Sequence, residues 1–165
     1  MTLAACALVL VGGFLGGVSR FFLSGVIGRA IGETFPWGTL LVNVSGALAI
    51  GAFAGAARAV GGVFASDLVR DLIVVGLFGG YTTVSSFCLQ TVNLALDGEG
   101  RLAAFNVVAS SVLCVLFVAL GFWAVVWAVS LTTWVVGSTT WVVGSTTWVV
   151  GSSTWIVGST TWVAG

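Results

Sequence analysis

Residues 79–87 read GGYTTVSSF and lie in the middle of an apolar run from Leu68 to Leu96. Glycine lowers helix stability by about 1 kcal/mol relative to alanine, and serine and threonine side chains compete for backbone hydrogen bonds. The stretch therefore favours an interruption of a helix from Gly79 to Thr83. Irregular backbone at membrane depth is tolerated only where protein buries it or a watery cavity meets it, and ions are handled at such places. A continuous helix that uses glycine for close packing is the alternative interpretation.

Composition places the chain in a membrane. It has 165 residues, of which 59% are hydrophobic and only 6% are charged, and a soluble domain of this size needs more charge to solvate its surface. A membrane-spanning helix needs about 20 apolar residues. Long apolar runs cover residues 3–27, 37–57, 68–96 and 102–129. The sequence therefore predicts an all-α integral membrane protein with four transmembrane helices, the third of them broken.

The end of the chain differs from the rest. From Thr132 onwards the motif TTWVVGS recurs, with a tryptophan at every seventh residue from Trp134 to Trp162. Neither helix nor strand periodicity gives a clean pattern, so its conformation stays open. We predict a membrane domain over residues 1–130 and a low-complexity tail over residues 131–165 that is interfacial or membrane-associated.

The ionisable residues exclude several functions. Five basic residues balance five acidic ones, and the chain has no histidine. Too little positive charge is present to neutralise the phosphates of a nucleic acid, so we expect no nucleic-acid partner. No nucleophile–base pair, phosphate-binding loop or metal cluster is recognisable, so we do not expect an enzyme.

The arginines show no preferred side of the membrane. With four spans, Arg29 and Arg101 fall on one side and Arg58 and Arg70 on the other. Two interpretations remain open: a short sequence that lacks a positive-inside bias, or a protein that inserts both ways and pairs as an antiparallel dimer. Four short spans enclose little of a pore alone, which favours an oligomer.

Polar residues inside the spans are candidates for function. Arg20 lies within the first span and either snorkels to the surface or has a structural or pore-entry role. Asn43 lies about two turns inside the second span and serves either as packing glue or as a ligand contact. In the last span, Asn106, Ser110 and Cys114 form a weakly polar stripe at intervals of four residues.

Four motifs together carry a family resemblance. They are GGFLGGVSRF at 12–21, FPWGTLLVNVSGALAIG at 35–51, GGYTTVSSF at 79–87, and a charged turn before a last span that contains asparagine. In this combination, over roughly residues 5–127, the chain resembles the CrcB/Fluc family of fluoride channels. The resemblance implies passive, fluoride-specific export that lowers cytoplasmic fluoride, by a multi-pass protein of the plasma (inner) membrane. It also implies an antiparallel, dual-topology homodimer in the lipid bilayer.

The resemblance further implies a structural sodium ion. By motif, its ligands are the backbone carbonyls of Gly79 and Thr82. A hard cation prefers oxygen ligands, so the chemistry is reasonable.

The same resemblance assigns an anion pathway. The amide N–H groups of Asn43 would donate to fluoride, and the ring edge of Phe87 would contact it. Ser85 and Ser86 match hydroxyl positions of the family motif, Ser110 matches more loosely, and Arg20 closes the first-span motif. Val84 departs from the family, which has phenylalanine at this position. One anion contact is therefore missing or is supplied by another residue.

Two alternatives belong to other functional classes. A small four-helix drug/proton antiporter needs a carboxylate inside the membrane, but all five acidic residues fall in links or at span edges. A non-conducting protein, or one that works only in a heterodimer with a paralogue, is favoured by Val84 and by the unusual tail.

Overall fold

The computed structural model describes the backbone of residues 2–32 and 34–154, and the side chains of residues 2–32 and 34–135. The regular secondary structure of these residues is all helical, and they contain no strand. The elements, in order, are α1 (Leu3–Ile31), α2 (Trp37–Ala59), the 3₁₀ turn η1 (Gly62–Ala65), α3 (Asp67–Arg70), the π-helical η2 (Asp71–Phe78), α4 (Gly79–Tyr81), α5 (Val84–Leu96) and α6 (Gly100–Thr154).

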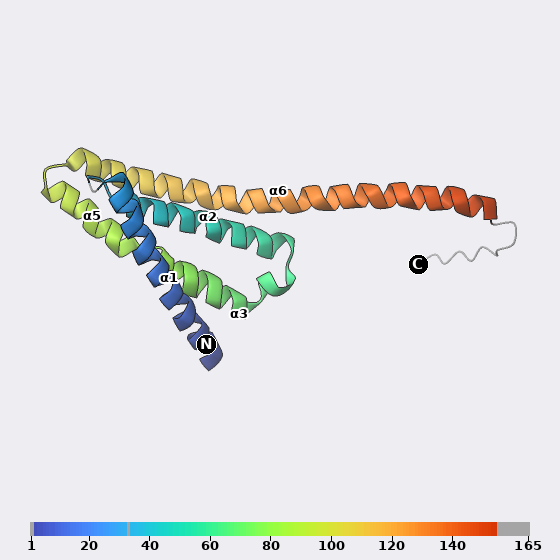
Figure 1. Ribbon diagram of the computed structural model, residues 1–165, viewed down its shortest axis with the longest axis horizontal. Helices are drawn as coiled ribbons and strands as arrows, with labels where there is room; N and C mark the ends of the chain where they lie inside the picture. The colour runs from blue at the N-terminus through green and yellow to red at the C-terminus, as the bar shows by residue number, and fades with distance from the viewer. Residues whose placement is uncertain (1, 33, 155–165) are drawn as a thin grey trace. The chain divides into compact units, whose positions relative to one another are not determined.

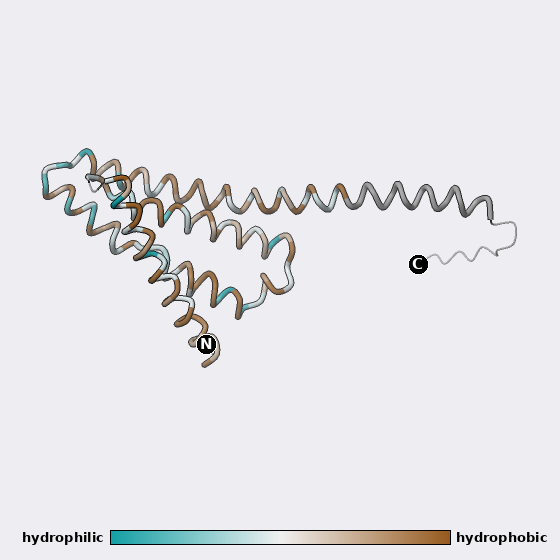
Figure 2. Tube along the Cα trace, in the orientation of Figure 1, coloured by the Kyte–Doolittle hydropathy of each residue, from teal (hydrophilic) through white to brown (hydrophobic). Residues whose placement is uncertain are grey.

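Four helical segments are long and apolar enough to cross a membrane. They are Leu3–Ile31, Trp37–Ala59, Asp67–Leu96 and Gly100–Val135, and the third combines α3, η2, α4 and α5. Apolar residues predominate along these segments, whereas hydrophilic residues gather at the turn between α5 and α6 (Figure 2). The prediction of an all-α protein with four membrane-spanning helices is confirmed.

The chain divides into two compact units, Met1–Trp127 and Ala128–Gly165. In the second unit the backbone is helical as far as Thr154, which answers for residues 132–154 the question that the repeat left open. The side chains from residue 136 onwards, and with them most of the repeated tryptophans, lie outside the described residues. The role of the tail stays a prediction.

Helix α2 is the central helix of the first unit. Nine of its residues are buried, against three of α1 and one of η2. Figure 1 shows α2 beside the part of α6 that belongs to this unit. There, a Cβ added at Gly55 would lie 2.6 Å from the Phe122 carbonyl oxygen, so the two backbones are in close contact. Phe35, Leu40 and Val44 form the buried apolar cluster at the start of α2.

Glycines also bring α1 against η2. A Cβ at Gly12 or at Gly16 would overlap the backbone of η2, and a Cβ at Gly80 of α4 would lie 2.9 Å from the Gly13 Cα. The paired glycines at residues 12–17 place small residues on one helix face, and this face is the one that another backbone approaches. Close approach matters here because helices in lipid associate through packing and hydrogen bonds rather than through the hydrophobic effect.

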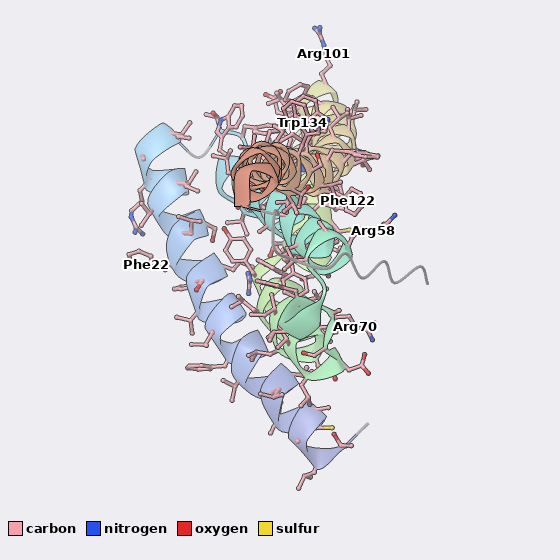
Figure 3. The ribbon with its side chains drawn as sticks, turned by 90° about the vertical axis from the view of Figure 1, so that its right-hand side faces the viewer. Phe22, Arg58, Arg70, Arg101, Phe122 and Trp134 are labelled. Atoms are coloured by element: carbon pink, nitrogen blue, oxygen red, sulfur yellow. The ribbon has the colours of Figure 1, made fainter. Side chains whose placement is uncertain are left out.

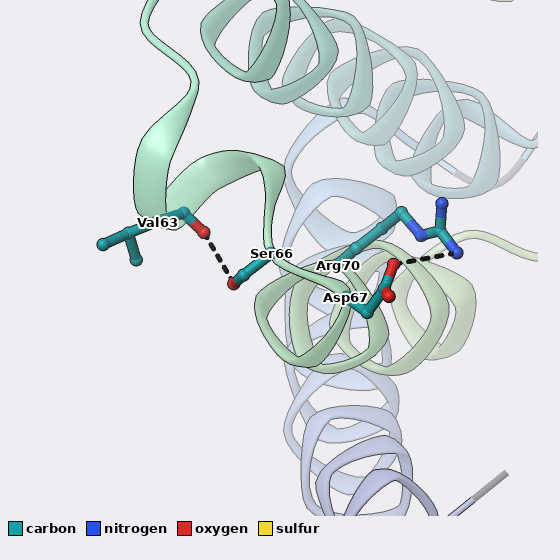
Figure 4. A network of polar contacts seen from close by, with 4 residues as sticks. All are labelled: Val63, Ser66, Asp67 and Arg70. Carbon is teal, nitrogen blue, oxygen red and sulfur yellow. Dashed lines mark hydrogen bonds and ion pairs between the residues drawn. The ribbon is translucent and has the colours of Figure 1, made fainter.

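Except for Arg20, the arginines lie near the ends of the spans. Arg58, Arg70 and Arg101 project outward from the ribbon (Figure 3). At the start of α3, Arg70 pairs with Asp67 at 3.7 Å, and Ser66 Oγ donates to the Val63 carbonyl at 2.8 Å (Figure 4). Both charged side chains are largely exposed, so the ion pair contributes at most about 1 kcal/mol.

Candidate functional site

The backbone between α4 and α5 is extended at two residues. Thr82 has φ −79° and ψ 155°, and Thr83 has φ −147° and ψ 123°. The eight-residue π-helical segment η2 comes shortly before them, and such segments often occur at functional sites. Extended residues lack the hydrogen bonds of a continuous helix, so their backbone groups need other partners inside a membrane.

Asn43 of α2 supplies these partners for Thr83. The Thr83 N–H donates to Asn43 Oδ1 at 2.8 Å, and Asn43 Nδ2 donates to the Thr83 carbonyl at 3.0 Å. The family resemblance implies that Asn43 is an anion contact. Among the described residues no hydrogen bond uses its second Nδ2–H, so one donor of this amide remains for a ligand.

The Thr83 side chain caps the start of α5. Its Oγ1 accepts from the Ser86 N–H at 3.2 Å, lies 3.1 Å from Ser85 Oγ, and donates to Ser86 Oγ at 3.3 Å. Threonine is a favoured N-cap residue because its oxygen satisfies one of the free N–H groups of the first turn. The hydroxyl groups of Ser85 and Ser86 are thereby gathered at one helix end. The same turn carries Val84, whose exposed fraction is 75%, and the half-buried Phe87.

The extended residues also release two carbonyls. In a continuous helix the Thr83 N–H would donate to the Gly79 carbonyl, but it donates to Asn43 instead. The Ser86 N–H would donate to the Thr82 carbonyl, but it donates to Thr83 Oγ1. Both carbonyls that the family resemblance assigns to sodium therefore lose their usual helical donors.

A second polar chain connects α6 to Phe87. The hydroxyl of buried Ser110 donates to Asn106 Oδ1 at 3.4 Å, and Asn106 Nδ2 donates to Thr91 Oγ1 at 2.8 Å. Thr91 in turn donates to the Phe87 carbonyl at 2.7 Å. Ser110 is thus brought to the helix that carries Phe87, but no hydrogen bond among the described residues links this chain to Asn43. Thr91 is not predicted as a site residue from the sequence, although its position four residues after Phe87 places both on one helix face.

Arg20 lines a cavity that extends along α5 from Thr83 to Asp97. The cavity has a volume of about 600 Å³ and is lined among others by Arg20, Arg29, Thr83, Ser86, Gln90 and Asp97. Gln90 Oε1 is buried and has no hydrogen-bond donor among the described residues. The two arginines outweigh the single carboxylate of Asp97 in the lining, so the cavity carries a net positive charge that can attract an anion. The predicted pore-entry role of Arg20 is compatible with this position.

The fold and the site define a small helical membrane protein with several spans, in which a short polar segment of extended backbone separates α4 from α5. The family described as "CrcB-like protein, Camphor Resistance (CrcB)" matches residues 7–122. The chain therefore belongs to the CrcB family, and the resemblance noted from its motifs is confirmed.

Several curated relatives are similar over most of their length. The chain is 63% identical over 127 residues to "Fluoride-specific ion channel FluC 4" of Brucella abortus, which covers 77% of this chain and 96% of the relative. It is 62% identical to "Fluoride-specific ion channel FluC 3" of Brucella suis, and this alignment also spans 77% of this chain and 96% of the relative. It is 55% identical to "Fluoride-specific ion channel FluC 2" of Rhodopseudomonas palustris, over 69% of this chain and 87% of the relative.

Proposed function

We propose that this chain forms a fluoride-specific channel of the plasma (inner) membrane that exports fluoride passively and lowers its cytoplasmic concentration. The observation that carries the proposal is the 63% identity to a fluoride-specific ion channel over 96% of that relative's length. The relatives are named as ion channels, which agrees with the prediction that the chain is not an enzyme. The four acidic residues that the structure describes lie near the start of the third span or in the turn after α5, so none of these carboxylates lies in the middle of a span, where proton antiport would need one.

The anion pathway would run along the first turn of α5. Fluoride is the hardest halide to dehydrate, so donors and positive ring edges must replace its water in a narrow pore. The remaining N–H of Asn43 and the hydroxyls of Ser85 and Ser86 are such donors, and the edge of the Phe87 ring offers the positive part of its quadrupole. Arg20 would raise the anion concentration at the entrance.

Ser110 would contribute only after a rearrangement. The Ser110 hydroxyl already donates its hydrogen to Asn106 Oδ1. Only its oxygen remains free, and an oxygen can accept a hydrogen bond but cannot donate one to fluoride. Rotation of the Ser110 hydroxyl would exchange this bond for one to fluoride. A weak starting bond favours such an exchange, and at 3.4 Å this one is long.

A structural sodium ion would be held by the Gly79 and Thr82 carbonyls. These residues fit a hard cation because both carbonyls have lost their usual helical donors, and Gly79 is exposed in the single chain. A bound sodium ion would supply positive charge close to the anion pathway. The role of this chain's own residues is to hold the two carbonyls free of competing hydrogen bonds.

The channel would be an antiparallel homodimer with dual topology. The balanced arginines allow both orientations, and a single copy exposes large apolar residues, among them Phe14, Phe21 and Val84. A second copy could cover part of this surface and complete a pathway that one chain leaves open at Val84 and Ser85.

A heterodimer with a paralogue is the second candidate. The observation that favours it is Val84, whose largely exposed side chain offers no quadrupole to an anion. A partner chain could supply the missing ring. In that case this chain would be silent on its own and would conduct only when it is coexpressed with that partner.

A growth assay tests the proposal in cells. The chain is expressed in a bacterium that lacks its own fluoride exporters and is grown on graded fluoride. We expect it to raise the tolerated fluoride concentration. A well-inserted protein that gives no protection would contradict function as a homodimer, and protection on coexpression with a paralogue would then establish the second candidate.

A further inference from the structure

The side chain of Asn43 pairs with the main chain of a residue 40 positions away. It accepts the Thr83 N–H at 2.8 Å and donates to the Thr83 carbonyl at 3.0 Å, so both backbone polar groups of one residue are satisfied by one amide. This is the pairing that a neighbouring strand would give to an extended residue. A side chain used only to bind an anion would not need it.

The pairing matters more in a membrane than it would in water. An unpaired backbone N–H or carbonyl in hydrocarbon costs several kcal/mol, and only helices and closed barrels avoid this cost by themselves. Thr83 has left the helix, so its extended conformation depends on an outside donor and an outside acceptor. Asparagine provides both at one carbon atom, which alanine and serine cannot do in this geometry.

Helix α2 fits the segment in two further ways. Three residues after Asn43, a Cβ added at Gly46 would lie 2.5 Å from Thr82 Cγ2 and 3.1 Å from Tyr81 Cδ1. The hydroxyls of Ser45 and Tyr81 lie 2.9 Å apart, and Ser45 Oγ also donates to the Val42 carbonyl. The Tyr81 hydroxyl is therefore the donor in the Ser45–Tyr81 bond. Helix α2 thus contacts each of the residues 81, 82 and 83.

We propose that Asn43 is a positioning residue that holds Thr83 extended and thereby keeps the Gly79 and Thr82 carbonyls free of helical hydrogen bonds. The step is direct: the Thr83 N–H that is bound by Asn43 is the one that would otherwise close on the Gly79 carbonyl. The inference rests on the proposed function only where it says what the free carbonyls are for, namely to bind sodium. Its structural claim, that α2 keeps this segment from becoming a continuous helix, stands on the hydrogen bonds themselves.

Amide hydrogen exchange at Thr83 tests the claim without fluoride or sodium. The full chain, labelled with ¹⁵N-threonine and placed in lipid nanodiscs, is followed by NMR, and the Thr83 signal is assigned from its loss in Thr83→Ser. In Asn43→Ala we expect the Thr83 amide to exchange about tenfold faster, because it loses its acceptor. Asn43→Asp is measured at acidic pH, where the carboxylic acid carries a proton: one oxygen then accepts the Thr83 N–H and the O–H donates to the Thr83 carbonyl, so we expect protection to be retained.

Asn106→Ala is the matched control. It also removes a side-chain amide that is bonded across helices, but its partner is Thr91. We expect Thr83 exchange to be unchanged in this variant. Unchanged Thr83 exchange in Asn43→Ala, or fast exchange already in the wild type, would overturn the inference. If Asn43→Ala does not fold, fast Thr83 exchange in a folded Asn43→Asp would overturn it as well.

Fluoride efflux from liposomes that contain the same protein variants separates the two claims. Asn43→Asp keeps the acceptor for Thr83 but loses the spare N–H, so protection should persist while fluoride efflux falls. A wild type that protects Thr83 but does not conduct fluoride would refute the proposed function and leave the positioning role intact. A conducting wild type in which Asn43→Ala leaves Thr83 protected would refute the positioning role alone.

Discussion

Asn106 of α6 donates from Nδ2 to Thr91 Oγ1 of α5 at 2.8 Å, and its exposed fraction is only 2%. Thr91 Oγ1 in turn donates a hydrogen bond to the Phe87 carbonyl at 2.7 Å. The last span is thereby connected to the backbone of the aromatic residue that we assign to the anion pathway. In the sequence, Asn106 is recognisable only as part of a polar stripe. The structure shows that this stripe is hydrogen-bonded to Thr91 of α5.

We expect Asn106→Ala to destabilise the protein by about 1 kcal/mol, because it removes one interhelical hydrogen bond and leaves Thr91 without a donor. The free energy of unfolding in detergent, titrated with a denaturing detergent, measures this. Asn93→Ala is the control, because Asn93 is exposed and should change stability little. A double variant with Thr91→Val should be less destabilised than the sum of the single variants, and full additivity would contradict the pairing.

Gly16→Ala should destabilise the protein by about 1–3 kcal/mol through overpacking. The added Cβ would overlap the Leu77 carbonyl oxygen and lie 2.8 Å from the Tyr81 backbone nitrogen. Gly17→Ala provides a matched control, since its Cβ would meet nothing within 4 Å. Thermal unfolding in detergent compares the two. Equal midpoints for both variants would show that α1 does not pack against η2 and α4 as described here.

Phe87→Ala should lower fluoride efflux at least tenfold while leaving the oligomer intact, because it removes the ring edge that replaces water around the anion. The tenfold loss corresponds to about 1.4 kcal/mol. Size-exclusion chromatography checks the assembly and a fluoride electrode measures efflux. The control is Phe105→Ala, a change to another partly exposed phenylalanine that lies outside the polar chains. Normal efflux through Phe87→Ala would remove Phe87 from the pathway.

Val84→Phe should keep or raise fluoride efflux if this position retains the role that the family gives it. Val84 has an exposed fraction of 75%, so a larger ring can be placed there without disturbing the core of the single chain. Efflux is compared with that of Val84→Leu, which adds bulk without a quadrupole. Loss of efflux in a folded Val84→Phe would mean that the pore has been rebuilt around valine.

Much of the fold follows from the sequence because membrane spans obey a simple rule. The apolar runs at residues 3–27 and 37–57 correspond to the helices Leu3–Ile31 and Trp37–Ala59. Each helix begins at the same residue as its run and ends a few residues later. The requirement to satisfy every backbone group in lipid makes long apolar runs helical. The close approach at Gly12 and Gly16 also follows from spacing alone, because residues four apart share a helix face.

Other features depend on contacts between distant segments. No local pattern indicates that residues 71–78 wind as a π-helix, or that the Asn43 amide pairs with Thr83. The sequence leaves Asn43 between packing and ligand binding because either role needs a polar group in the second span. The difference lies in what faces it, and that is set by how α2 packs against the segment at residues 81–83. Gln90 was missed for the same reason, since only the packed structure buries its oxygen.

Fluoride efflux from liposomes tests the central claim most directly. The purified chain is reconstituted into vesicles loaded with fluoride or, in parallel, with chloride, and efflux is followed with ion-selective electrodes. We expect fast fluoride efflux and no chloride leak above that of protein-free vesicles. Absence of fluoride efflux from a folded, reconstituted protein, or equal efflux of both halides, would contradict a fluoride-specific channel built from this chain alone.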